Sequence, residues 1–73
     1  MDEELHIGHV IKNELKNQGR TITWLSKQLG YTRQNLYKIF ERKWIYTDLL
    51  YKISQIMHYD FFQHYSKKLY DYM

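Results

Sequence analysis

Apolar residues recur at helical spacing along nearly the whole 73-residue chain, and this periodicity limits the fold more than any other feature. The chain has no proline to interrupt a helix, no Asn-Gly or Asp-Gly turn, and no long alternating run typical of strands. The pattern therefore predicts an all-α fold, a compact bundle of about five short helices. We expect these helices at about 5–17, 22–29, 33–41, 48–58 and 60–73.

Glycine and threonine mark the expected helix boundaries. Gly19 and Gly30 follow apolar stripes, where a left-handed cap residue usually ends a helix. Thr21, or alternatively Thr23, is expected to cap the second helix, because a threonine hydroxyl accepts a hydrogen bond from the free backbone N–H groups of the first turn. The same reasoning assigns caps to the third, fourth and fifth helices: Thr32, Thr47 and Asp60.

The size and composition of the chain limit how it can be stabilised. A chain this short is expected to form one domain over residues 1–73, burying about 60% of the surface that the unfolded chain exposes. It has no cysteine, so its core must rely on apolar packing or on a partner chain. The acidic N-terminus is unlike a secretory signal, and no apolar run approaches the ~20 residues of a membrane span. We therefore expect a cytoplasmic protein.

Basic charge is concentrated in the middle of the chain. The net charge is +3, but residues 12–52 hold nine Lys or Arg side chains against three acidic ones. A localised excess of positive charge is typical of proteins that bind a phosphate backbone. On its own this charge favours an ordinary solvated basic surface, so a nucleic-acid function depends on the local helix pattern.

The segment from Ile22 to Glu41, ITWLSKQLGYTRQNLYKIFE, predicts two short helices joined by a very tight turn. Gly30 permits the left-handed backbone that redirects the chain, and the small Ser26 lets a neighbouring helix approach closely. Four apolar residues lie where two helices that cross at a steep angle share a core: Leu25, Leu29, Leu36 and Ile39. This pattern is typical of a DNA-binding helix-turn-helix.

These residues and the downstream stretch TDLLYKISQIMHYDFF resemble the Cro/C1-type helix-turn-helix family, which contains phage-repressor-like regulators of bacteria. The resemblance covers about residues 7–62. Ser26 stands where the family most often has alanine, which is a small departure. The resemblance implies a lambda-repressor-like fold, double-stranded DNA as the partner and regulation of transcription as the function. It places the recognition helix, about residues 32–41, in the major groove.

The polar side of the third expected helix carries the candidate base-reading residues. At about 100° per residue, Gln34, Tyr37 and Lys38 point away from the apolar side around Leu36, while Arg33 lies at the flank in the first turn. Arginine suits guanine and glutamine suits adenine in the major groove. The resemblance implies base contacts from Arg33, Gln34 and Lys38, with Tyr37 touching thymine methyl groups or the backbone. The alternative is an amphipathic helix whose polar face is merely solvated.

Specific binding also needs contacts to the phosphate backbone, which fix the register of the protein on the duplex. Basic and hydroxyl side chains around the helix pair suit this purpose, as do the backbone N–H groups at helix N-termini. The candidates are Thr23, Lys27, Thr32, Arg42, Lys43 and Tyr46. Arg42 and Lys43 have an alternative structural role, because cations stabilise a helix C-terminus, and Glu41 is placed to pair with either of them.

The two tryptophans and the aromatic C-terminus are expected to serve packing first. Trp24 is expected at the edge of the core, and Trp44 is expected to pack rather than to contact DNA. Residues 60–73 predict an aromatic-rich helix that closes the core with Phe61, Phe62, Tyr65 and Leu69. The alternative is a homodimer interface on one face of this helix, formed by Tyr65, Leu69 and Tyr72.

No residue pattern indicates catalysis or a cofactor. His6 and His9 have a spacing that can ligate a metal, but only His58 and His64 remain to complete a set, and cysteine is absent. We find no nucleophile with a base, no glycine-rich phosphate loop and no sign of a small-molecule substrate pocket, so neither an enzyme nor a metal site is expected. A rival function is a protein-interaction module, such as a helix-turn-helix antitoxin bound to its toxin.

Overall fold

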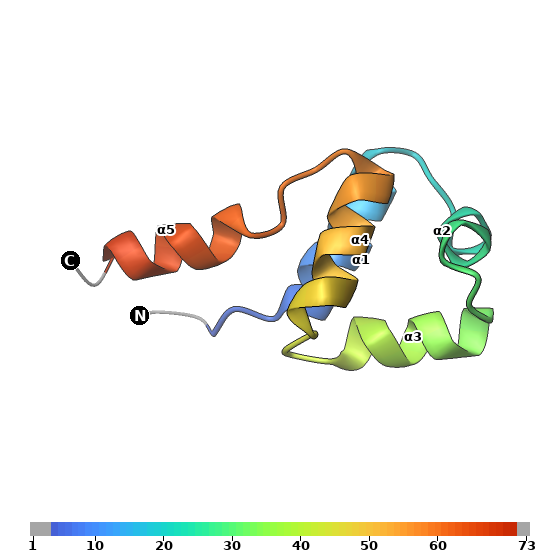
Figure 1. The fold of residues 1–73 in the computed structure, drawn as a ribbon, viewed down its shortest axis with the longest axis horizontal. Helices are drawn as coiled ribbons and strands as arrows, with labels where there is room; N and C mark the ends of the chain where they lie inside the picture. The colour runs from blue at the N-terminus through green and yellow to red at the C-terminus, as the bar shows by residue number, and fades with distance from the viewer. Residues whose placement is uncertain (1–3, 72–73) are drawn as a thin grey trace.

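The computed structural model describes residues 4–71, and all regular secondary structure in this part of the chain is helical. The helices are α1 (Ile7–Asn17), α2 (Ile22–Leu29), α3 (Arg33–Glu41), α4 (Thr47–Met57) and α5 (Gln63–Asp71). The predicted all-α bundle of five short helices is therefore confirmed. Figure 1 shows α2 and α3 on one side of the bundle and α5 projecting from the opposite side.

Side-chain caps explain where α1, α2 and α3 begin. The hydroxyl of Thr21 accepts the backbone N–H of Trp24 at 3.0 Å, and the hydroxyl of Thr32 accepts that of Asn35 at 3.1 Å. These two predicted caps are confirmed, and α2 and α3 begin at the predicted residues. Helix α1 begins later than predicted, because the His6 ring accepts the N–H of the third residue after it and caps the helix there.

The predicted cap at Thr47 is wrong. Thr47 is the first residue of α4, and Tyr46 occupies the N-cap position without a side-chain hydrogen bond to the helix. The carbonyl of Tyr46 accepts the N–H of Leu50 at 2.9 Å, so the first turn starts one residue earlier than a Thr47 cap would set it. Asp48 lies in that first turn, where its carboxylate is favoured by the helix dipole and accepts the N–H of Leu49.

Left-handed residues end three of the helices. Gly19 follows α1 with a φ of 69°, and Gly30 caps α2 with a φ of 73°, as the sequence predicts. His58 caps α4 with a φ of 51° and is the one non-glycine residue with positive φ among residues 4–71. These caps reverse the chain within a few residues and keep the connections short.

Helices α1 to α4 and the turn before α5 supply the core. Twelve apolar side chains of the described residues are buried: Ile7, Ile11, Leu15, Leu25, Leu29, Leu36, Ile39, Phe40, Leu50, Ile53, Met57 and Phe61. The predicted shared core of α2 and α3 is therefore confirmed. Ser26 is also buried, and its hydroxyl donates to the Thr23 carbonyl at 2.9 Å. Trp24 is half-buried at the edge of this core as predicted, with the Arg20 guanidinium 4.1 Å from its ring centre.

Helix α5 differs from the prediction in where it begins and in what it covers. The chain forms a turn after Asp60, whose carboxylate accepts the N–H of Phe62, and α5 begins only at Gln63. Phe61 is buried, and Phe62 and Tyr65 pack partly against the core. Leu69 is 68% exposed, so its predicted part in closing the core is wrong. Tyr72 and Met73, the remaining predicted apolar positions of this helix, lie outside the described residues.

The projection of α5 lengthens the molecule. The radius of gyration is 12.5 Å, against about 11 Å for a compact chain of this length. No side chain of α5 is buried. None of the helices within residues 4–71 is both long enough and apolar enough to cross a membrane.

Candidate nucleic-acid interface

The turn between α2 and α3 contains only Gly30, Tyr31 and Thr32. The N–H of Tyr31 donates to the Ser26 carbonyl at 2.9 Å and closes the end of α2, after which the Thr32 hydroxyl caps α3. Gly30 has a φ of 73° and a ψ of 26°, a left-handed conformation that a residue with a Cβ adopts only at a cost. Local sequence therefore sets the direction in which α3 leaves α2.

One side of α3 is buried and the other is open. Leu36, Ile39 and Phe40 are at most 4% exposed and anchor the helix in the core. The four predicted base-reading residues are all exposed: Arg33, Gln34, Tyr37 and Lys38. None of these side chains makes a hydrogen bond, an ion pair or a ring contact with another residue of the described chain. Their polar groups are therefore available to an external partner.

A groove between α3 and the start of α4 brings cations and tyrosines together. Three predicted contact residues line it: Lys38, Arg42 and Tyr46. Tyr31, Asn35 and Asp48 line it as well, and Asp48 adds one negative charge at its α4 side. Thr23, Lys27 and Thr32, the other predicted backbone contacts apart from Lys43, are exposed but do not line this groove.

Tyr31 and Asn35 are groove residues that the sequence analysis missed. Asn35 precedes Lys38 by three positions, and Lys38 precedes Arg42 by four, so helical periodicity alone places these three on one side of α3. That signal was present in the sequence. Tyr31 belongs to the turn, where no periodicity applies, and nothing in the sequence indicates which way its ring points.

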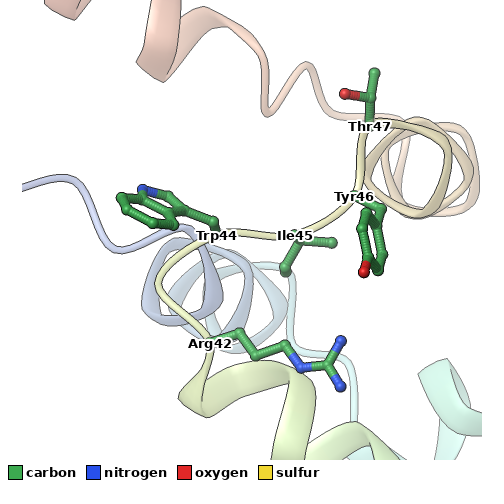
Figure 2. Close-up of a pocket in the computed structure, with 5 residues that line it drawn as sticks. All are labelled: Arg42, Trp44, Ile45, Tyr46 and Thr47. Atoms are coloured by element: carbon green, nitrogen blue, oxygen red, sulfur yellow. The ribbon is translucent and has the colours of Figure 1, made fainter.

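The loop between α3 and α4 directs its side chains two ways, as Figure 2 shows. The Arg42 guanidinium and the Tyr46 ring extend toward the same open space, whereas Trp44 points away from them. Trp44 is 73% exposed, so its predicted packing is wrong. The backbone becomes extended at Arg42, with a ψ of 130°, which carries the following residues off the helix axis. Tyr46 is 77% exposed, which leaves its hydroxyl accessible.

Lys43 is less available than the other predicted phosphate contacts. Its ammonium pairs with the carboxylate of Glu4 and lies 5.8 Å from the ring centre of Trp44. The predicted pairing of Glu41 with Arg42 or Lys43 is wrong. Within the described part of the chain, Glu41 forms no ion pair with either residue, and Glu4 supplies the carboxylate that pairs with Lys43. A DNA phosphate would have to displace Glu4 to reach this lysine.

Two shifted pKa values occur at the start of α5 rather than on α3. Burial lowers the pKa of His64 from 6.5, and the positive charge of Lys67 lowers it further, while Asp60 and Glu14 oppose these effects. Burial raises the pKa of Tyr65 above 10.0. The hydroxyl of Tyr59 and the Nε2 of His64 form a hydrogen bond of 3.0 Å. These groups hold α5 at its base.

The described residues contain no group of three or more His, Cys, Asp or Glu side chains placed to hold a metal ion. No family model, no curated protein and no solved structure matches the chain. A functional assignment therefore has to follow from the chemistry and geometry of the chain itself.

Proposed function

We propose that this protein is a sequence-specific DNA-binding regulator of transcription, of the phage-repressor type, with α2 and α3 as its helix-turn-helix. The observation that carries the proposal is the outer face of α3. Its four long polar side chains are exposed and unpartnered on a helix whose other face is firmly anchored: Arg33, Gln34, Tyr37 and Lys38. Such side chains are suited to the donor and acceptor pattern of base edges.

The dimensions of α3 support insertion into a duplex. An α-helix with its side chains is about 10–12 Å across and the major groove is about 12 Å wide, so the nine-residue helix α3 fits into it. Recognition helices of this class contact bases with their N-terminal residues. Arg33 and Gln34 are the first two residues of α3, where no preceding turn covers them.

The flanks of α3 are suited to hold the phosphate backbone. Arg42 and Tyr46 extend into one space at the C-terminal end of the helix, while Thr23 and Lys27 are exposed on the preceding helix. Residues 12–52 supply the excess positive charge that attracts a polyanion. If about six phosphates are neutralised, the logarithm of the binding constant falls against the logarithm of salt with a slope of about −5.

Two copies of the chain would give useful specificity where one recognition helix reads too few base pairs. Helices about 34 Å apart read the two halves of a pseudo-palindrome in successive major grooves. The exposed apolar residues of α5, Leu69 and Tyr70, are available for contact with a second copy. This homodimer belongs to the proposal.

The second candidate function is a protein-interaction module, such as an antitoxin. The exposure of Leu69 at 68%, Tyr70 at 73% and Trp44 at 73% favours it, because large apolar side chains that stay in water often mark a protein interface. Antitoxins often also bind DNA, so the two functions separate only by which partner binds through which surface.

Selection of bound sequences from a random duplex pool, followed by titration of the selected and a random duplex, tests the proposal. Arg33→Ala and Gln34→Ala should each cost about 1–3 kcal/mol on the selected duplex and much less on the random one. Lys67→Ala removes a matched positive charge from α5 and should leave the preference for the selected duplex unchanged. A thermal melt of each variant checks that it is folded.

Two results would contradict the proposal. If Arg33→Ala and Gln34→Ala weaken both duplexes equally, these residues do not read bases. If the wild type binds no duplex at any salt concentration, α3 is not a recognition helix and the protein-interaction function becomes the better assignment.

A further inference from the structure

The start of α1 is joined to the end of α3 by consecutive hydrogen bonds. Three carbonyls in a row, those of Glu41, Arg42 and Lys43, each accept a bond of 3.1 Å. The donors are, in that order, the His6 ring, the Gly8 N–H and the Ile7 N–H. A helix start leaves N–H groups without partners and a helix end leaves carbonyls without partners, so each end satisfies the other. The positive end of the α1 dipole also faces the negative end of the α3 dipole.

Gly8 makes this approach possible. It is buried, and a Cβ at this position would overlap the carbonyl oxygens of Phe40 and Arg42. The backbone of α1 therefore lies as close to the backbone of α3 as a residue without a side chain permits. Both backbone polar groups of Arg42 are hydrogen-bonded. Its carbonyl accepts from the Gly8 N–H, and its N–H donates to the Ile39 carbonyl at 3.0 Å.

His6 is the one side chain that supplies a donor at this junction. The backbone N–H of His9 can only donate, so the Nδ1 of His6 accepts from it at 3.1 Å. The carbonyl of Glu41 can only accept, so the Nε2 of His6 carries the proton that reaches it. One neutral ring thus does two things at once: it caps α1 and it ties α1 to the last residue of α3.

We propose that His6 is a positioning residue for DNA binding, acting through Arg42. This inference rests on the proposed function, in which Arg42 contacts a phosphate at the C-terminal flank of the recognition helix. The tie at Glu41 adds to the backbone hydrogen bonds of Arg42 itself in holding the backbone from which the Arg42 side chain extends, so Arg42 meets the phosphate with less backbone freedom left to lose. Without the tie, the backbone of the free protein gains some mobility at residues 41 and 42, and this mobility has to be lost on binding, so affinity falls.

Two substitutions separate the two tasks of His6. In His6→Asn, the side-chain oxygen takes the place of Nδ1 and keeps the cap, since asparagine is a good N-cap, but nothing reaches Glu41. In His6→Gln, the side-chain amide nitrogen takes the place of Nε2 and keeps the tie, but the cap is lost. If the role of His6 is purely structural, DNA affinity should fall in His6→Gln, which loses the cap. If His6 is a positioning residue, DNA affinity should fall in His6→Asn, which loses the hydrogen bond to Glu41.

The experiment titrates a random-sequence DNA duplex over a range of salt concentrations with the wild type, both His6 variants, Arg42→Ala, and Arg42→Ala combined with His6→Asn. A random duplex suffices, because phosphate contacts act on every sequence. We expect Arg42→Ala to lower affinity about 3–10-fold and to lower the size of the salt slope by about 1. We expect His6→Asn to lower affinity about 3–10-fold as well, but with an unchanged salt slope, because the Arg42 charge is still present and still neutralises its phosphate. His6→Gln should bind as the wild type does despite a lower melting temperature. Adding His6→Asn to Arg42→Ala should lower affinity no further.

Each other result has a definite reading. Wild-type affinity in His6→Asn would overturn the positioning role while leaving the proposed function intact. Additive losses in the double variant would also overturn it, because His6 would then not act through Arg42. Failure of the wild type to bind any duplex would instead remove the proposed function, on which the inference depends.

Discussion

The molecule has a body, residues 7–61, and an arm, helix α5. Both have amphipathic sequence patterns, but only the body buries its apolar side chains. The body buries twelve apolar side chains, and its first three helices begin at side-chain caps. The arm buries none and leaves Leu69 and Tyr70 about as exposed as the loop residue Trp44. Helical periodicity therefore tells where a helix forms, but it does not tell whether a surface of the same molecule covers the apolar face.

The largest expected effect lies where the arm joins the body. Phe61 is fully buried and its ring centre lies 4.6 Å from that of Tyr59. Phe61→Ala should lower the free energy of unfolding by about 3–5 kcal/mol, because it removes a buried aromatic side chain and leaves a cavity. Denaturant melts measure this loss. Phe62→Ala, one residue nearer the arm and only half-buried, is the matched control and should cost clearly less; an equal cost would place the boundary of the body beyond residue 61.

The second largest effect is expected inside the body, at Gly8. Helix propensity alone predicts that Gly8→Ala stabilises the protein by about 0.5–1 kcal/mol. The carbonyl oxygens of Phe40 and Arg42 leave no room for the added methyl group, so we expect a loss of about 3 kcal/mol, at the upper end of the usual cost of overpacking. Asn13→Ala, at an exposed position of α1, serves as the control. A gain in stability for Gly8→Ala would mean that α1 and α3 separate easily.

The sequence predicts the structural features that are determined by residues close together in the chain. The spans of α2 and α3, the caps at Thr21 and Thr32, and the outward direction of three α3 side chains depend on residues within one or two turns. These predictions are confirmed by the geometry, although the function of that face remains a proposal. The body is thus the part in which local patterns and tertiary packing agree.

The features that the sequence does not predict depend on contacts between distant segments. The Glu4–Lys43 ion pair and the His6–Glu41 hydrogen bond join residues far apart in the chain, and no spacing rule indicates them. The exposure of Trp44 follows from how the chain leaves α3, and that of Leu69 from where the body ends. A pattern of apolar residues does not indicate which surfaces of the folded chain come into contact.

The arm itself should contribute little to folding. Leu69→Ala should change the free energy of unfolding by less than about 0.5 kcal/mol, because its side chain is already 68% exposed. The same substitution in the body, Leu36→Ala, should cost about 2–5 kcal/mol. Both melts are made at a protein concentration low enough to avoid association. A loss above about 1 kcal/mol for Leu69→Ala would show that the arm packs on the body in solution.

The smallest effect is expected from pH, acting on His64 at the base of the arm. Its pKa lies below 6.5 in the folded protein, mainly because burial disfavours the charged ring and also because Lys67 lies nearby. The unfolded chain then takes up the proton more readily than the folded one. The stabilising contribution of neutral His64 is fully present above pH ~6.5 and is lost as the pH falls from there through the folded pKa. Stability should therefore decline slightly on acidification.

Melts of the wild type, His64→Gln and His58→Asn between about pH 8 and pH 5 isolate this contribution. His64→Gln keeps a polar group near the Tyr59 hydroxyl but cannot take up a proton, so its stability should depend less on pH than that of the wild type. His58→Asn removes an exposed histidine, and asparagine tolerates the left-handed backbone at that position, so the share of the pH dependence that comes from His64 should persist. If His64→Gln and the wild type lose stability in parallel, the base of the arm is open to water, and His64 does not contribute to the pH dependence.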